Sequence, residues 1–282
     1  MDLQLGDKTV FITGASGGIG RALALEFAAE GAQLALVGGT QHAEMEACIA
    51  GQPWRARALA LHADTTSTLE IDVAMEKARE HFGRVDVCVA NAGRWTPEAK
   101  LLHRADEQRI RANLEVNLFG SIWTARAFFD ALSRSTPRRD GHGASLIFVG
   151  STAGRFGEKG HAEYAAGKAA LAGLVLTLKN EIVELDPWGR VNLIEPGWTV
   201  THMARAALEV PGTIAKVVRT MPLRQLARAK DVARSAVFLA SPAASRHVSG
   251  ETITVAGGME GRVQWDASEI DEDRVRRRLE QE

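Results

Sequence analysis

Residues 8–30 read KTVFITGASGGIGRALALEFAAE and combine a strand, a glycine-rich turn and a helix. The run from Lys8 to Thr13 is short, apolar and β-branched, whereas the segment from Arg21 to Glu30 has helical propensity and an apolar stripe. Glycine permits the tight turn between them and lets backbone N–H groups approach a phosphate at the helix N-terminus. This order of elements indicates a nucleotide-binding α/β domain.

The alternation of strands and helices continues along the chain. Further strands are expected at 34–37, 57–62, 85–90, 145–149, 190–194 and 252–255. Apolar strands that alternate with helices predict a single Rossmann-type, doubly wound α/β domain, with a parallel sheet of about seven strands and helices on both faces. We expect this domain to span residues 1–260, with a substrate loop at about 198–224, and to be followed by a charged C-terminal tail at 261–282.

The composition is that of an ordinary globular protein of 282 residues. Lys and Arg number 34 against 35 Asp and Glu, so the net charge of −1 favours a small-molecule ligand over nucleic acid or an anionic membrane. The sequence has neither a signal-like start nor an apolar run of membrane-spanning length, and Cys48 and Cys88 form no CxxC pair. A cytoplasmic location is therefore expected. The eight histidines are scattered, so no metal site is predicted.

Residues able to bind a ligand follow the predicted strands. Ligands of parallel sheets bind at the carboxyl ends of the strands. In this sequence those ends are marked by Gly14, Gly38, Asp64, Asn91, Ser151 and Pro196. One edge of the sheet is therefore expected to carry the chemistry.

The segment from Ser151 to Lys168 holds a hydroxyl, a phenol and an ammonium. Tyr164 and Lys168 are four residues apart, on one face of an expected helix at 162–184, and Tyr164 is the only tyrosine in the chain. A neighbouring cation favours the phenolate and lowers the pKa of a tyrosine, which brings proton transfer within reach at neutral pH. Ser151 would hydrogen-bond the same substrate oxygen. A half-buried ring beside a solvated ammonium would give the same spacing.

Six motifs together give the chain a resemblance to the short-chain dehydrogenase/reductase family over about residues 8–259. They are TGASGGIG at 13–20, ANAG at 90–93, VNLFG at 116–120, Ser151, YAAGK at 164–168 and PGWTVTHM at 196–203. The resemblance implies a catalytic tetrad of Asn117, Ser151, Tyr164 and Lys168, with Asn113 as a rival to Asn117. In relatives the asparagine holds a water that links the lysine to solvent, and the lysine also binds the nicotinamide ribose.

The resemblance also implies an activity. It is the NAD(P)(H)-dependent interconversion of a secondary alcohol and a ketone by hydride transfer, with Tyr164 as the acid/base. A 3-oxoacyl-(acyl carrier protein) reductase-like enzyme is a narrower alternative, which Arg138 and Arg139 would support only if the fold brings them near the cleft. A non-catalytic nucleotide-binding regulator is a further alternative, but such proteins commonly lose the tyrosine or the lysine.

The cofactor contacts that the resemblance implies lie at the strand ends and in the motifs. They are Gly14, Ser16, Gly18, Ile19, Gly20, Gly38, Thr40, Asp64, Asn91, Ala92, Gly93, Tyr164, Lys168, Pro196, Gly197, Thr199 and Thr201. NAD enzymes usually end the second strand with an acid for the ribose 2′-hydroxyl. Gly38, Gly39 and Thr40 stand there instead, which favours NADP(H) over NAD(H). Asp64 either meets the adenine or caps a helix, and Asn91 either binds cofactor or braces the strands.

The substrate residues are marked less clearly. Four side chains lie in segments that line the pocket of family members: Trp95, Phe156, Trp198 and Met203. They favour a bulky apolar substrate, although each could equally pack in the core. His161 and Arg94 are nearby polar candidates without an assigned role.

The resemblance further implies a homodimer or homotetramer. Helices at 106–133, with a break before Asn117, and at 162–184 would pack against their copies in a dimer, and the C-terminal strand region would build a tetramer. From Trp265 onward the tail is dense in charge, and we expect either a frayed helix or a segment ordered by a partner subunit.

Overall fold

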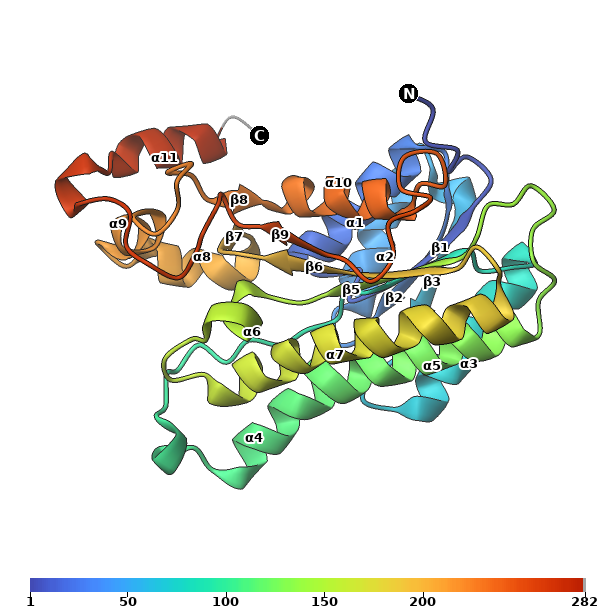
Figure 1. Cartoon of the computed structure of the whole chain (residues 1–282), viewed down its shortest axis with the longest axis horizontal. Coiled ribbons are helices and arrows are strands. Elements are labelled where there is room, and N and C mark those ends of the chain that lie inside the picture. Colours follow the sequence, from blue (N-terminus) through green and yellow to red (C-terminus); the bar gives the residue numbers. More distant parts are fainter. Residues whose placement is uncertain (281–282) are drawn as a thin grey trace.

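A seven-stranded parallel sheet with helices on both faces forms the centre of the protein (Figure 1). The computed structural model describes residues 1–280, apart from the side chains of His202, Met203, Ala206 and Leu279. The strands follow the order β3-β2-β1-β4-β5-β6-β9. Their bounds are β1 Thr9–Thr13, β2 Gln33–Gly38, β3 Ala58–His62, β4 Val87–Ala90, β5 Ser145–Val149, β6 Arg190–Pro196 and β9 Thr252–Val255. The predicted fold class is confirmed.

The helices fall into two layers and a separate lobe (Figure 1). One layer holds α1 (Gly18–Ala29), α2 (His42–Ala50) and α10 (Ala229–Ala240). The other holds α3 (Thr68–Phe82), α4 (Glu107–Leu114), α5 (Gly120–Ser133) and α7 (Ala162–Leu185), while the short α6 (Thr152–Phe156) follows β5. The lobe holds α8 (His202–Glu209), α9 (Thr213–Val218) and α11 (Glu272–Glu280), next to the small parallel pair β7 (Thr199–Val200) and β8 (Ala227–Arg228). Within residues 1–280, none of the helices is both long and apolar enough to cross a membrane.

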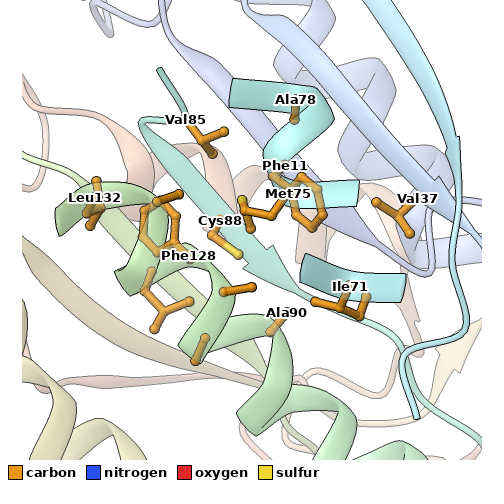
Figure 2. Packing of buried hydrophobic residues seen from close by; sticks show 14 of the residues in the cluster. Phe11, Val37, Ile71, Met75, Ala78, Val85, Cys88, Ala90, Phe128 and Leu132 are labelled. Carbon is orange, nitrogen blue, oxygen red and sulfur yellow. The ribbon is translucent and has the colours of Figure 1, made fainter. Parts of the chain in front are cut away.

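Side chains that alternate along each strand supply both faces of the sheet. In β1, Val10 and Ile12 pack under α1 and α10, whereas Phe11 packs on the opposite face with Met75 of α3 and Phe128 of α5 (Figure 2). Each large side chain buried in this way contributes about 1.5–3 kcal/mol of transfer free energy. Because both faces are covered, the strands read as continuous apolar runs in the sequence.

The C-terminal tail packs on its own chain. Val275 of α11 is buried with Leu208 of α8 and Ile214 of α9, in a core separate from those of the sheet. Trp265 Nε1 donates a hydrogen bond to Met221 O at 2.9 Å, and the guanidinium of Arg224 lies 3.3 Å from the centre of the Trp265 ring. The tail therefore packs on the lobe of its own chain, where the sequence had suggested a frayed helix or a segment ordered by a partner subunit.

Ion pairs stabilise the end of the sheet at which the strands begin. Arg138 Nε and Nη2 donate to the carboxylate of Asp86 at 2.6 and 2.8 Å, and Arg138 Nη1 donates to Asp7 at 3.0 Å. Asp86 directly precedes β4, so Arg138 and its neighbour Arg139 lie at the amino ends of the strands. The condition under which these two arginines would have supported an acidic carrier protein is not met.

Candidate active site

The glycine turn after β1 is shaped by close backbone contacts. Gly14 has a left-handed φ of +64°, and a Cβ there would lie 2.8 Å from Ala92 Cα. A Cβ on Gly20 would lie 2.1 Å from Gly14 O, so α1 can pack this closely only without one. Helix α1 begins at Gly18 after Gly17, which has no side chain to cap the first turn. The N–H groups of that turn therefore fit a dinucleotide pyrophosphate.

Asn91 braces this turn. Its Nδ2 donates to Thr13 O at 2.9 Å and to Gly14 O at 3.2 Å. Thr13 Oγ1 accepts hydrogen bonds from the backbone N–H groups of Asn91 and Ala92 at 3.1 and 3.2 Å. Of the two expected roles for Asn91, the bracing of the central strands is the one that these bonds establish. Thr13, which the sequence did not single out, fastens the same corner.

The ends of β2 and β3 form the next part of the edge. Asp64 Oδ1 accepts from Thr66 N and Thr66 Oγ1, both at 2.9 Å, and so builds the turn after β3. The cap of α3 is Ser67, whose Oγ accepts from Glu70 N at 3.3 Å. The interpretation of Asp64 as the helix cap is therefore wrong.

Two basic side chains stand near the end of β2. Arg21 Nε donates to Ser16 O at 2.8 Å, and its Nη2 lies 3.6 Å from Glu44 of α2. His42 is the first residue of α2, and its backbone N–H donates to Gly39 O at 3.0 Å. The sequence pattern did not point to Arg21 or His42, because neither residue directly follows β2.

Ser151 and Lys168 are positioned by the end of β5. Ser151 is the N-cap of α6, and its Oγ accepts from Ala153 N at 3.1 Å. Lys168 is 3% exposed on α7, and its Nζ donates to Val149 O at 2.9 Å. The strand and α7 therefore place the hydroxyl, the phenol of Tyr164 and the ammonium at one edge, as the sequence predicted.

The electrostatics differ from the expectation. Burial lowers the pKa of Lys168 from 10.5 to about 8. Burial raises the pKa of Tyr164, and the hydrogen bond with Ser151 acts in the opposite direction. The expectation that Lys168 lowers the pKa of the tyrosine stays a prediction. In the protein alone, the lysine ammonium donates to the carbonyl of Val149, and the hydrogen bond with Ser151 favours the phenolate.

Asn117 lies in a π-helical turn, Glu115–Phe119, between α4 and α5. Its Nδ2 donates to Arg94 O and to Asn113 Oδ1, both at 2.8 Å, and its Oδ1 accepts from Arg94 N at 3.1 Å. The expected break thus contains Asn117, and Asn113 is its partner. Arg94 enters the network through its backbone.

Gly93 lets this network approach Lys168. A Cβ at Gly93 would lie 3.1 Å from Asn117 Oδ1 and 3.3 Å from Lys168 Nζ. The backbone after β4 therefore passes close to two members of the expected tetrad, and a Cβ at this position would press on both.

A cavity of about 180 Å³ opens in front of Ser151 and Tyr164. Its other lining residues are Ile19, Trp95, Gly150, Thr152, Ala153, Gly157, Glu158, Pro196, Gly197, Trp198, Thr199, Thr201, Ala204, Ala207 and Met259. Trp95 and Trp198 were expected here. Phe156 is 38% exposed, contacts neither this cavity nor its neighbour, and packs instead near Gly261. The side chain of Met203 lies outside the described residues.

Trp95 is held against Tyr164 by aromatic contacts. Its ring centre lies 4.9 Å from that of Tyr164 in an edge-to-face arrangement and 3.9 Å from that of His161. Burial and the charge of Arg109 lower the pKa of His161, which favours the neutral ring. His161 thus has a role that the sequence left unassigned.

A buried ion pair fastens the segment that carries Trp95. Arg109 Nε donates to Glu163 Oε1 at 2.8 Å, and its Nη1 donates to Glu98 O at 2.7 Å. The side chains of Arg109 and Glu163 are 7% and 1% exposed. This pair could not be predicted from the sequence, because the partners come from different helices and neither belongs to a motif.

Comparisons with known proteins agree with this geometry. The family model described as short chain dehydrogenase matches residues 8–210. The chain is 34% identical over 252 residues to the 3-oxoacyl-[acyl-carrier-protein] reductase FabG of Escherichia coli, covering 89% of this chain and 97% of that protein. It is 32% identical over 258 residues to the 7alpha-hydroxysteroid dehydrogenase of the same organism, covering 91% and 96%.

A solved structure has the same fold. A short-chain dehydrogenase/reductase described as a glucose/ribitol dehydrogenase, from Brucella melitensis, superposes with a TM-score of 0.80 at 30% identity and covers 92% of this chain and 98% of its own. The fold and the site define an oxidoreductase with a Rossmann-type nucleotide-binding domain. The chain belongs to the short-chain dehydrogenase/reductase family, whose enzymes act on CH–OH and keto groups with NAD(P). The alternative of a non-catalytic regulator is set aside.

Proposed function

We propose that this enzyme interconverts a secondary alcohol and a ketone with Tyr164 as the acid/base. The observation that carries the proposal is the meeting of Ser151 and Tyr164 on one cavity that the segment after β6 also lines. Ile19 of the glycine turn lines the same cavity, which supports a cofactor site that is continuous with the substrate site. A nicotinamide bound at this edge supplies or accepts the hydride.

The protein groups handle the proton. Ser151 donates a hydrogen bond to the substrate oxygen, and Tyr164 gives that oxygen a proton in reduction and removes it in oxidation. Burial raises the pKa of Tyr164, and the hydrogen bond with Ser151 acts in the opposite direction. Lys168, with a pKa of about 8, lies one helical turn away and holds a proton in the same pH range. Asn117 keeps the backbone at Arg94 in register with this pair.

The Tyr164→Phe variant tests the proposal. Loss of the hydroxyl should lower kcat for ketone reduction by about 10²- to 10⁴-fold, the usual contribution of a positioned acid. Cofactor binding, followed by fluorescence, and the thermal midpoint should stay near those of the wild type. Turnover at the wild-type rate in this variant would rule out Tyr164 as the acid/base.

For the cofactor we propose NADP(H). Gly38, Gly39 and Thr40 present no carboxylate at the end of β2, and Arg21 and His42 supply basic groups nearby. The Arg21→Ala variant should raise the Kd for NADPH by about 10-fold, as expected for the loss of one charged hydrogen bond, with a smaller change for NADH. The matched variant Arg55→Ala, of an exposed residue, should change neither. Equal losses for both cofactors would count against a 2′-phosphate contact.

A 3-oxoacyl-(acyl carrier protein) reductase is the second candidate, because a relative at 34% identity carries that name. Rates with an acetoacetyl thioester of acyl carrier protein and with the same thioester of a small thiol separate the two. A large preference for the protein-bound substrate would favour the second candidate.

We also propose a homodimer formed by α5, α7 and the π-helical turn before α5. This surface exposes apolar side chains, with Phe119 38%, Leu176 56% and Val183 41% exposed. A homotetramer would add a contact at β9, the edge strand of the sheet. Light scattering on the purified chain, with Leu176→Arg as the disrupting variant, measures the assembly.

The free thiols of Cys48 and Cys88 support a reducing location such as the cytoplasm.

A further inference from the structure

The cavity at Ser151 and Tyr164 continues into a second cavity of about 330 Å³. The two share four lining residues, Glu158, Trp198, Ala207 and Met259. The second cavity extends under α9, between Val210, Val217 and Lys216. A substrate whose reacting carbon lies at Tyr164 can therefore extend into the lobe.

The lining of this joined space is mostly apolar, with two charged exceptions. Glu158 stands where the two cavities meet, and Lys216 lines the outer one. Among the described residues, the Glu158 carboxylate has no hydrogen bond or ion pair, although the charge of Lys216 acts on it. Glu158 is half-buried, and this burial raises the pKa of its carboxyl group. A half-buried acceptor without a protein partner in a ligand cavity is available to a donor group on the ligand.

The two opposite charges restrict the group that can fill this position. A cationic group on the ligand would be repelled by Lys216, and an anionic group would be repelled by Glu158. A purely apolar group would leave the carboxylate unpaired. A neutral hydroxyl can donate to Glu158 and accept from Lys216, because it carries both a donor and lone pairs.

We propose that Glu158 and Lys216 select a ketone or alcohol with an apolar ring body and a second hydroxyl remote from the reacting carbon. That hydroxyl donates to the Glu158 carboxylate and accepts from the Lys216 ammonium. The apolar body lies between Trp198 and Met259. The inference rests on the proposed function for the reacting end of the substrate, and it concerns the opposite end.

A pair of matched substrates tests the inference. We would compare kcat/KM for a decalone, a two-ring ketone, with that of decalones that carry a hydroxyl on the second ring. In the wild type at least one hydroxyl isomer should be favoured by about 10- to 100-fold, the range for a hydrogen bond to a charged group. The preference should disappear in Glu158→Leu and fall several-fold in Lys216→Met.

Matched variants separate this effect from general damage. Glu80→Leu on α3 and Lys159→Met, both of exposed residues outside the two cavities, should keep the full preference. Should Glu158→Leu fold poorly, Glu158→Gln removes only the charge and should reduce the preference several-fold. A preference that survives in the Glu158 variants overturns the inference, and so does a stronger preference for an amino group in place of the hydroxyl.

Binding distinguishes the failure of this inference from the failure of the proposed function. Calorimetry with the cofactor present should give tighter binding of a hydroxydecalone than of the decalone to the wild type, and equal binding to Glu158→Leu. If this difference in affinity is found but the enzyme reduces none of the ketones, the proposed function is contradicted and the hydroxyl site is supported. If both ketones are reduced with equal kcat/KM and bound with equal affinity, the hydroxyl site is contradicted and the proposed function is supported.

Discussion

The edge of the sheet that carries the expected tetrad and the lobe that covers it are built differently. At the edge, Asn117 is 0% and Lys168 3% exposed, and both are bonded to backbone carbonyls. The lobe has a core of its own, to which Val275 of the tail contributes, and it presents Lys216 and Val210 to the substrate cavity. The proposed reacting groups are therefore held in place by the sheet, whereas the walls of the outer cavity depend on a separate core.

The largest expected effect is a pH-dependent change in the free energy of unfolding, caused by the burial of the Lys168 ammonium at the carboxyl edge of the sheet. The pKa of this lysine is about 8 in the folded chain, below its ordinary 10.5, so between these pH values the unfolded chain binds a proton that the folded chain lacks. Below pH 8 both states are protonated, and the cost of burying the charge is fully present. The stability of the wild type relative to Lys168→Met should rise by about 3 kcal/mol as the pH increases from 7 to 10.5.

Urea unfolding of both proteins at pH 7, 8.5 and 10 measures this difference. The control variant Lys77→Met, of an exposed residue on α3, should follow the wild type at every pH. A stability difference between wild type and Lys168→Met that does not change with pH would mean that the edge is solvated, and the contrast with the lobe would then lose its basis.

The next effect concerns the close approach at Gly93. In Gly93→Ala the new methyl group meets Asn117 Oδ1 and Lys168 Nζ, so it should displace both and lower kcat/KM by about 10- to 100-fold. The control is Gly173→Ala on α7, where the space around a Cβ is open. That variant should keep its activity and gain up to about 1 kcal/mol in stability, because alanine favours the helix. Wild-type kinetics in Gly93→Ala would show that the edge adapts to the extra atom.

A smaller effect is expected from the lobe. Trp265→Ala removes the hydrogen bond to Met221 O and the stacking on Arg224, so α8 and α9 should be held less firmly. We expect KM to rise by roughly 3- to 10-fold with kcat nearly unchanged, since binding is lost equally in the ground and transition states.

Trp188→Ala is the matched control for the lobe. Trp188 also lies against an arginine, with Arg246 at 4.1 Å from its ring centre, but it belongs to the segment between α7 and β6. Steady-state kinetics of both variants should show a raised KM only for Trp265→Ala. A fall in kcat of the same size as the rise in KM would show that the lobe also positions the reacting groups.

Sequence alone predicted what depends on local pattern. The strand and helix order followed from apolar periodicity, and the four-residue spacing of Tyr164 and Lys168 placed them on one helix. The direction of the tyrosine's pKa shift could not be predicted, because it depends on burial and on where the Lys168 ammonium points. The spacing showed that the lysine is near, whereas the bond to Val149 O decides what it does.

Contacts between segments that are distant in the sequence could not be predicted either. Arg109 and Glu163 belong to no motif, and Glu158 and Lys216 line one cavity only because α9 folds over the end of the sheet. The tail is a similar case, since its dense charge suggested a frayed helix or a segment ordered by a partner subunit, while the structure buries Val275 of this segment in the lobe. A charged helix can pack through a single apolar stripe, and a stripe of so few residues is a weak signal in the sequence.

The packing of α10 on α1 has a consequence for how the chain is made. Val232, Ala233 and Ala236 of α10 share one buried cluster with Leu23 and Phe27 of α1. During synthesis from the N-terminus, the apolar faces of the first strands and of α1 stay uncovered until residues 229–240 have emerged from the ribosome. Contacts so distant in sequence form slowly and leave apolar surface exposed in the meantime. The nascent protein therefore passes through a long aggregation-prone interval that ends only when its last sheet-covering helix arrives.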